Sequence, residues 1–136
     1  MPLYMCNSPA GTISDDAKVK ISNDIVRIHC GVTGAPAEFV HAFFVEDAAT
    51  PPLNGQSAFL FGSIRGGRTD EQKAQIVREM QASIVAHSGL DAAVVTVATR
   101  DTPASWVMEG GEILPEPGEE AAWMKDFNAK LAEAAK

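Results

Sequence analysis

Two arginines flanking a pair of glycines have the clearest potential for binding chemistry in this sequence. Arg65 and Arg68 lie in "SIRGGRTD", between a stretch that predicts a strand and a stretch that predicts a helix. A guanidinium group offers a planar set of donors that matches a carboxylate, and the free amides of a helix N-terminus also favour an anion. The segment therefore predicts a site for a small carboxylate. The alternative is two surface arginines paired with nearby acids such as Asp70.

Pro2 is the second candidate, at the head of a strand predicted over 2–6. Proline is tolerated at the first position of a strand, so its place there has a purely structural explanation. The chemical alternative is that Met1 is removed and Pro2 carries a free secondary amine. Burial beside cations lowers the pKa of an α-amino group from about 7.7–8.0. A neutral proline nitrogen would take a proton from an enol and return it to carbon, whereas a protonated one would act as the acid in a hydration reaction.

Two further side chains each have a structural and a chemical interpretation. His29 lies late in a predicted helix beside an apolar stripe, where a half-buried core histidine is the more common case. Glu109 lies in "SWVMEGG", where apolar neighbours would desolvate its carboxyl group and suit it to proton transfer. The alternative for Glu109 is a surface acid at a turn.

The elements that must position these residues form a pattern that occurs twice. Strand, helix and strand are predicted at 2–6, 14–34 and 38–46, and again at 57–65, 69–89 and 92–99. At an offset of 55 residues Ser14 corresponds to Thr69 and Gly34 to Gly89, so both helices share a hydroxyl N-cap and a glycine stop signal. This internal repeat indicates a duplicated β-α-β unit.

The duplication predicts an α/β (α+β) fold with a four-stranded sheet and two helices on one face. Because Pro2 corresponds to Ser57, the start of the chain and the loop after 57–65 are expected in one cleft. The other sheet face would be bare, and a bare apolar face is normally covered by a partner. We therefore expect an oligomer of odd symmetry about a central barrel of sheets. The side chains expected on that face are Phe43, Phe44, Phe59, Phe61 and the valines of 94–97.

The length of 136 residues predicts a single domain over 1–136. Within it, the repeats cover about 2–46 and 57–99, and a C-terminal extension covers 100–136. The extension is rich in proline and glycine, with one helical turn around 103–109 and an amphipathic tail helix. The apolar stripe of that helix, Trp123, Phe127 and Leu131, is expected to pack against the body or a neighbouring subunit.

The composition excludes several classes of partner. The formal charge of −7 argues against nucleic acid or an anionic membrane surface as the main partner. No apolar run approaches the ~18 residues of a membrane-spanning helix, and no signal-peptide pattern is present, so we expect a cytoplasmic protein. Cys6 and Cys30 form no CxxC motif and are expected to be small apolar fillers in a reducing compartment. No metal and no cofactor are expected.

The motifs together resemble those of a known family. Pro2, the helix end "HCGVTG", the pair "RGGR" and the segment "MEGGEILPEPG" occur in this order. Their spacing is similar to that of the tautomerase superfamily, and specifically of its cis-3-chloroacrylic acid dehalogenase group. The resemblance spans residues 2 to about 123. It implies a homotrimer of duplicated β-α-β subunits with the fold of macrophage migration inhibitory factor.

The resemblance also implies a role for each matching residue. Pro2 would shuttle a proton. Arg65 and Arg68 would bind and polarise the carboxylate of a small-molecule substrate, and His29 would assist them. Glu109 would position or activate water.

The sequence departs from the dehalogenase group at a position that takes part in the reaction. The group has a tyrosine in the fourth strand that helps the glutamate to activate water, and Ala98 aligns with it here; Ala35 and Phe39 also differ from the group's pattern. Losing one of two activating groups would lower the rate of hydration about 10²–10⁴-fold if that group acts as a general base.

We therefore expect an isomerase that catalyses keto–enol tautomerisation of a 2-oxo acid. The alternatives are a hydrolase or hydratase acting on a cis-3-haloacrylate, and a non-catalytic trimeric binding protein.

Overall fold

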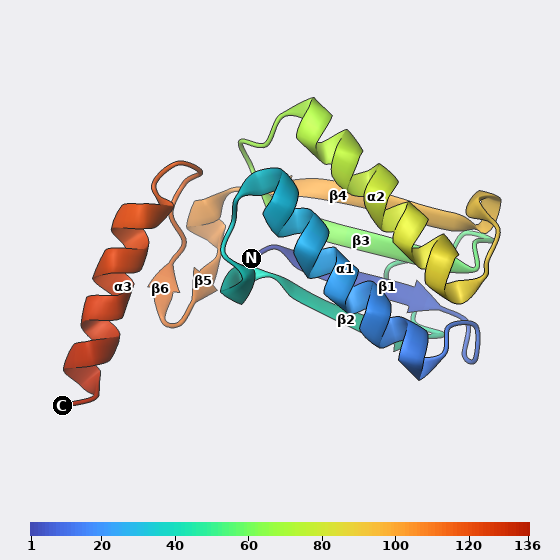
Figure 1. Cartoon of the computed structure of the whole chain (residues 1–136), viewed down its shortest axis with the longest axis horizontal. Helices are drawn as coiled ribbons and strands as arrows, with labels where there is room; N and C mark the ends of the chain where they lie inside the picture. The colour runs from blue at the N-terminus through green and yellow to red at the C-terminus, as the bar shows by residue number, and fades with distance from the viewer.

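A four-stranded sheet with two helices on one face forms the body of the protein in a computed structural model, which describes all residues from 1 to 136 (Figure 1). The strands lie in the order β2-β1-β3-β4, with β1 parallel to β2, β3 parallel to β4, and β1 antiparallel to β3 at the centre. The predicted duplicated β-α-β fold is confirmed. The strand bounds are β1 Leu3–Ser8, β2 His41–Glu46, β3 Ala58–Arg65 and β4 Val95–Thr102.

The two helices, α1 (Asp15–Thr33) and α2 (Asp70–Ser88), begin and end as their sequences predict. The Ser14 hydroxyl accepts a hydrogen bond from the third amide of α1, and the Thr69 hydroxyl does the same for α2, both at 3.1 Å. Gly34 and Gly89 close the helices in the left-handed conformation, with φ of 76° and 77°. None of the helices combines the length and hydropathy that a membrane crossing requires.

Two predicted strands, 38–46 and 92–99, begin later than expected because short 3₁₀ turns occupy their first residues. The turns are Ala37–Phe39 and Ala92–Val94, and the offset of 55 residues relates one to the other. The Asp91 carboxylate caps the second turn by accepting a hydrogen bond from the Ala93 amide at 2.8 Å, whereas no side chain caps the first. The fourth strand also runs three residues beyond its predicted end at 99, because β3 pairs with it along its full length.

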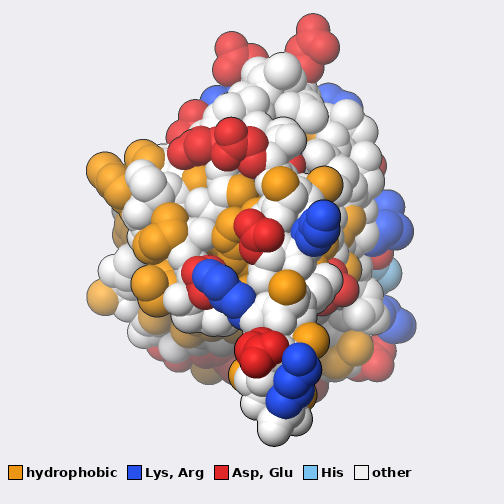
Figure 2. Space-filling model, turned by 90° about the vertical axis from the view of Figure 1, so that its left-hand side faces the viewer, with side chains coloured by type: hydrophobic (Ala, Val, Ile, Leu, Met, Phe, Trp, Pro, Cys, Tyr) orange, Lys and Arg blue, Asp and Glu red, His pale blue; other side chains and the backbone are white.

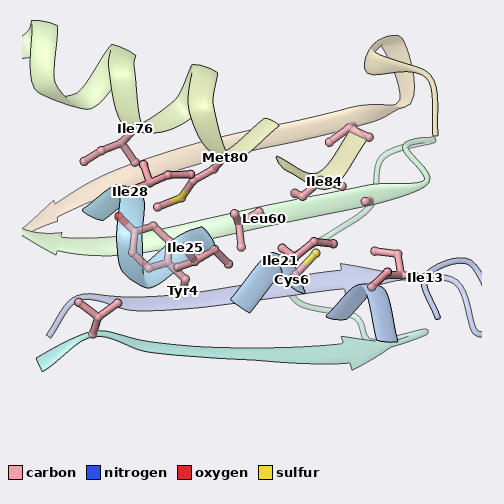
Figure 3. Packing of buried hydrophobic residues seen from close by; sticks show 14 of the residues in the cluster. Tyr4, Cys6, Ile13, Ile21, Ile25, Ile28, Leu60, Ile76, Met80 and Ile84 are labelled. Atoms are coloured by element: carbon pink, nitrogen blue, oxygen red, sulfur yellow. The ribbon is translucent and has the colours of Figure 1, made fainter. Parts of the chain in front are cut away.

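The hydrophobic core lies between the sheet and the two helices (Figure 3). Alternate residues of the strands point into it, as the period of two requires, and the apolar stripe of α1 covers them. Cys6 is buried there, as predicted for a small filler, while Cys30 is only partly buried. Apart from Ile13 in the loop before α1, the labelled core side chains come from β1, α1, β3 and α2 and include Tyr4, Ile21, Ile25, Leu60, Ile76 and Met80.

The opposite face of the sheet has no covering layer within the chain. Leu3, Met5, Phe59 and Phe61 line a groove on it. The prediction of a bare apolar face is confirmed for Phe59 and Phe61 and is wrong for Phe44, which packs against the core. Val95 and Val97 also belong to the helix side of the sheet. The reason is the alternation of side chains along a strand, which a run of consecutive apolar residues conceals.

The C-terminal extension lies at one end of the molecule, apart from α1 and α2 (Figure 1). It contains a 3₁₀ turn (Ala104–Trp106), a small hairpin of β5 (Met108–Glu109) and β6 (Glu112–Ile113), and α3 (Glu120–Ala134). The Trp123 indole donates a hydrogen bond to the Ile113 carbonyl at 2.7 Å and stacks on Phe127. Leu131, the third residue of the predicted stripe, remains 53% exposed. Hydrophobic side chains are exposed at this end between acidic and basic ones (Figure 2).

Candidate active site

The N-terminus lies at the end of the sheet nearest the β5–β6 hairpin (Figure 1). Pro2 is buried, and its carbonyl accepts a hydrogen bond from the His41 amide at 3.0 Å. Met1 is 7% exposed, and its amino group contacts the Glu109 carboxylate. Standard backbone dimensions place the Pro2 nitrogen within about 4 Å of the Met1 nitrogen. The structure therefore brings Pro2 and Glu109 into one region, although 107 positions separate them in the numbering.

Arg65 is the last residue of β3 and is 3% exposed. Its guanidinium donates to the Pro115 carbonyl at 2.5 Å and to the Glu120 carboxylate at 2.9 Å. Arg68 follows in the loop before α2. It lies 4.0 Å from the same Glu120 oxygen and donates a long hydrogen bond of 3.4 Å to the Thr33 carbonyl. The alternative of surface arginines paired with nearby acids such as Asp70 is met only in the pairing: the acid is Glu120, Arg65 is buried, and Asp70 pairs with Lys73 instead.

The Arg68 side chain retains unused hydrogen-bonding capacity. Its Nε atom is buried and has no hydrogen-bond partner. Since a buried donor without a partner costs about 1–3 kcal/mol, such an atom calls for an explanation. A carboxylate bound beside Arg68 would satisfy it. This atom is the feature of the arginine pair that points most directly to a ligand.

His29 lies on α1 with 2% of its surface exposed. Its Nδ1 atom lies 2.7 Å from the Tyr4 hydroxyl, within hydrogen-bonding distance. Burial, reinforced by the positive charges of Arg68, Arg65 and the N-terminus, lowers the pKa of His29 to about 3. Burial likewise raises the pKa of Tyr4 well above its ordinary value. Both rings are therefore neutral near pH 7, and they form a buried polar pair within electrostatic reach of Arg68.

The same environment acts on the N-terminal amine. Burial first, and the charge of Arg65 second, lower the pKa of the Met1 amine to about 5. The residues that interact electrostatically with His29 include Arg65, Arg68 and the N-terminus, so these groups share one region of low dielectric and positive charge. Burial and the Arg65 charge would lower the pKa of an amine at Pro2 in the same direction, toward the neutral form that a general base requires.

Sequence reasoning did not identify every residue of this region. Tyr4, His41 and Glu120 touch the predicted site residues, yet no motif marked them. Pro115, which binds Arg65, lies in the segment "MEGGEILPEPG" but was given no role. Only the early position of Tyr4 in the strand after Pro2 is a signal that a sequence pattern could have used. Ala98 pairs with Phe61 in the sheet. No set of three or more His, Cys, Asp or Glu side chains is grouped in a way that could hold a metal ion.

Comparison with known proteins agrees with this arrangement. Residues 1–128 match the family described as "Putative oxalocrotonate tautomerase enzyme". The chain belongs to the tautomerase superfamily. A protein of Bradyrhizobium diazoefficiens named "Probable tautomerase bsl7456" is 37% identical over 54 residues, which cover 40% of this chain and 81% of that protein. The family recognised from the sequence motifs is thereby confirmed.

Among solved structures, one from the dehalogenase family resembles this chain along nearly its full length. The structure of N1, a member of the cis-3-chloroacrylic acid dehalogenase family, is 25% identical with a TM-score of 0.81 and covers 96% of this chain and 99% of its own. A fused 4-OT enzyme solved as a symmetric trimer has a TM-score of 0.71 at 23% identity, covering 82% of this chain and 94% of its own. The second likeness concerns the fold alone.

Proposed function

We propose that this protein is a cofactor-independent tautomerase that transfers a proton on a small 2-oxo acid through the nitrogen of Pro2. The observation that carries the proposal is the shared location of the N-terminal nitrogen, Glu109 and the two arginines. Membership of the tautomerase superfamily supports the isomerase class. Removal of Met1 is part of the proposal, because the Pro2 nitrogen is an amide while Met1 is attached and accepts no proton.

Each group has a defined part in this reaction. Arg68, with its unpartnered Nε, and Arg65 bind the substrate carboxylate, and His29 supports them from below. The neutral Pro2 nitrogen accepts a proton from the carbon beside the keto group and returns it in the reverse direction. The negative charge that develops on the substrate is stabilised by the guanidinium groups, which are preorganised in a region of little solvent.

The experiment compares wild type with Pro2→Ala in an assay of 2-oxo acid tautomerisation. Intact-mass spectrometry first establishes whether Met1 is absent. We expect Pro2→Ala to lower kcat by about 10²-fold or more, in the range of general acid–base catalysis. Pro9→Ala, at the far end of β1, is the matched control and should keep full activity. A Pro2→Ala enzyme as active as wild type, or a native protein that retains Met1, would exclude the mechanism and favour a non-catalytic binding protein.

Hydration of a cis-3-haloacrylate, ending in dehalogenation, is the second candidate. The position of Glu109 beside the N-terminal nitrogen and the similarity to N1 favour it. In this reaction Glu109 directs the water and a protonated Pro2 supplies the proton. Glu109→Gln separates the candidates: a loss confined to hydration supports this reaction, whereas a silent substitution removes it.

The proposed active form is a homotrimer. The uncovered apolar groove of the sheet supports association through that face, and a fold neighbour was solved as a trimer. Burying such a face stabilises an assembly at roughly 25 cal/mol per Å² of apolar surface.

A further inference from the structure

His41 occupies a place beside the N-terminus that neither the motifs nor the family comparisons assign. It is the first residue of β2, and its amide is bound to the Pro2 carbonyl at 3.0 Å. Its Nε2 atom lies 3.5 Å from Oε1 of Glu109. Since β2 fixes the backbone of His41 to Pro2, its side chain is held beside the same carboxylate that faces the N-terminal nitrogen.

The imidazole of His41 is also open to solvent. Its side chain is 56% exposed, whereas that of Glu109 is only 19% exposed. Both residues line a pocket of about 320 Å³ together with Met1, and a second pocket on the α3 side, where Glu38 is the other charged lining residue. The ionisable groups that line these pockets with His41 are therefore Glu109 and Glu38, and the N-terminal amine lies against the same Glu109 carboxylate.

We propose that His41 is a proton-relay residue that acts through Glu109. The proposal rests on the tautomerase function above and assigns the second proton of that reaction. Tautomerisation exchanges a proton at carbon and another at oxygen, and the Pro2 nitrogen serves the carbon. Glu109 serves the oxygen, and His41 connects Glu109 to solvent because its imidazole contacts that carboxylate and is itself exposed.

The relay is balanced in protons and electrons. In the keto-to-enol direction the neutral Pro2 nitrogen takes a proton from the carbon beside the keto group, and the electron pair of that C–H bond forms the C=C bond. The former C=O π pair takes a proton at oxygen from the Glu109 carboxyl group. The Glu109 carboxylate then regains a proton from His41, which takes one from water, and the Pro2 ammonium releases its proton to water. No other reactant is consumed.

The relay also bears on the missing tyrosine. Ala98 provides no second activating group, and His41 is a titratable side chain already in contact with Glu109. His41 thus contributes the partner that this carboxylate lacks, from β2 rather than from β4.

The first test is kinetic. We expect His41→Ala to lower kcat about tenfold or more with KM changed less than twofold, and added imidazole to restore part of the rate. The double variant His41→Ala/Glu109→Gln should be no slower than Glu109→Gln alone, because residues that act as a unit are not additive. The relay would be overturned if the double variant lost the product of the two single losses in kcat, or if imidazole left the rate of His41→Ala unchanged. His87→Ala is the matched control, since His87 also lies beside a carboxylate, that of Asp24 at 3.0 Å, and should keep full activity without responding to imidazole.

The second test needs no enzymatic activity. Imidazole ¹⁵N chemical shifts at pH 7 are compared between wild type and Glu109→Gln. The signals of His41 should shift and those of His87 should not, whereas Asp24→Asn should do the reverse. Unchanged His41 signals would overturn the proposal whatever the kinetics show. If the His41 signals shift but the activity does not depend on Pro2, the contact between His41 and Glu109 is established and its catalytic role is excluded. In that case the proposed tautomerase function is the part that failed.

Discussion

The Glu120 carboxylate accepts a hydrogen bond from the Arg65 guanidinium at 2.9 Å, although 55 residues separate the two in sequence. A second hydrogen bond, from Arg65 to the Pro115 carbonyl, ties the same guanidinium to the segment before α3. The first turn of α3 thereby closes the arginine end of the site. The carboxylate of the protein lies where the carboxylate of a substrate would bind.

Replacing Glu120 with glutamine tests this internal competition. Because a bound substrate must displace Glu120 from Arg65, we expect Glu120→Gln to lower KM for a 2-oxo acid by about two- to fivefold, the scale of a partly exposed ion pair. Steady-state kinetics measure it, with Glu119→Gln as the matched control because no side-chain hydrogen bond of Glu119 caps α3. An increase in KM would mean that Glu120 holds Arg65 in place and does not compete.

The buried His29 makes stability depend on pH. Its pKa is about 3 when folded and 6.5 in its ordinary state, so between these values the unfolded chain binds a proton that the folded chain does not. The free energy of unfolding should therefore fall as the pH drops from about 6.5 toward 3, by up to about 1.4 kcal/mol per pH unit. Urea denaturation across this range should show a shallower fall in His29→Gln.

In a chain that retains Met1, the N-terminal amine adds a fall of the same sign between pH 8 and about 5, because its pKa is lowered to about 5. The difference between the His29 variant and wild type below pH 5 is therefore the informative quantity. Equal slopes there would show that His29 is protonated in the folded protein.

Substitutions at two adjacent glycines test how α3 packs against the β5–β6 hairpin. Gly110 and Gly111 both have positive φ, 60° and 83°, so alanine strains the backbone at either position by about 1 kcal/mol. A Cβ at Gly110 would lie 2.5 Å from the Phe127 ring, whereas a Cβ at Gly111 meets open space. Amide hydrogen exchange in α3 should accelerate in Gly110→Ala and stay near wild type in Gly111→Ala. Equal exchange in both variants would mean that Phe127 moves aside without cost.

A charge on the uncovered sheet face should dissociate the assembly. Met5 lines the apolar groove, and Met5→Glu places a carboxylate where the homotrimer would bury it. Light scattering should report a trimer for wild type and a smaller species for the variant. Val19→Glu is the control, because Val19 is 61% exposed on α1 and not on the sheet face. A monomeric wild type would contradict association through this face.

Much of this protein follows from short-range sequence signals. The sequence alone determined both helices. Their caps, at Ser14 and Thr69, and their stops, at Gly34 and Gly89, depend on neighbours within one turn of helix. The repeat at 55 residues then relates one helix to the other. The errors concern the starts of two strands and the direction of their side chains. The apolar pattern conceals the 3₁₀ turns before β2 and β4, of which only the second has a side-chain cap. The side of the sheet that a strand residue faces depends on its register, which pairing with a distant strand sets.

The grouping of the site was decided by the tertiary structure alone. Tyr4 contacts His29 across 25 residues, and Glu120 contacts Arg65 across 55. Contacts of this kind arise from the packing of β1 against α1 and from the return of the C-terminal extension to the end of β3. Residue type can nominate a proline, a histidine or an arginine for chemistry, but burial and neighbouring charges decide which of their protons move. Those two quantities exist only once the chain has folded.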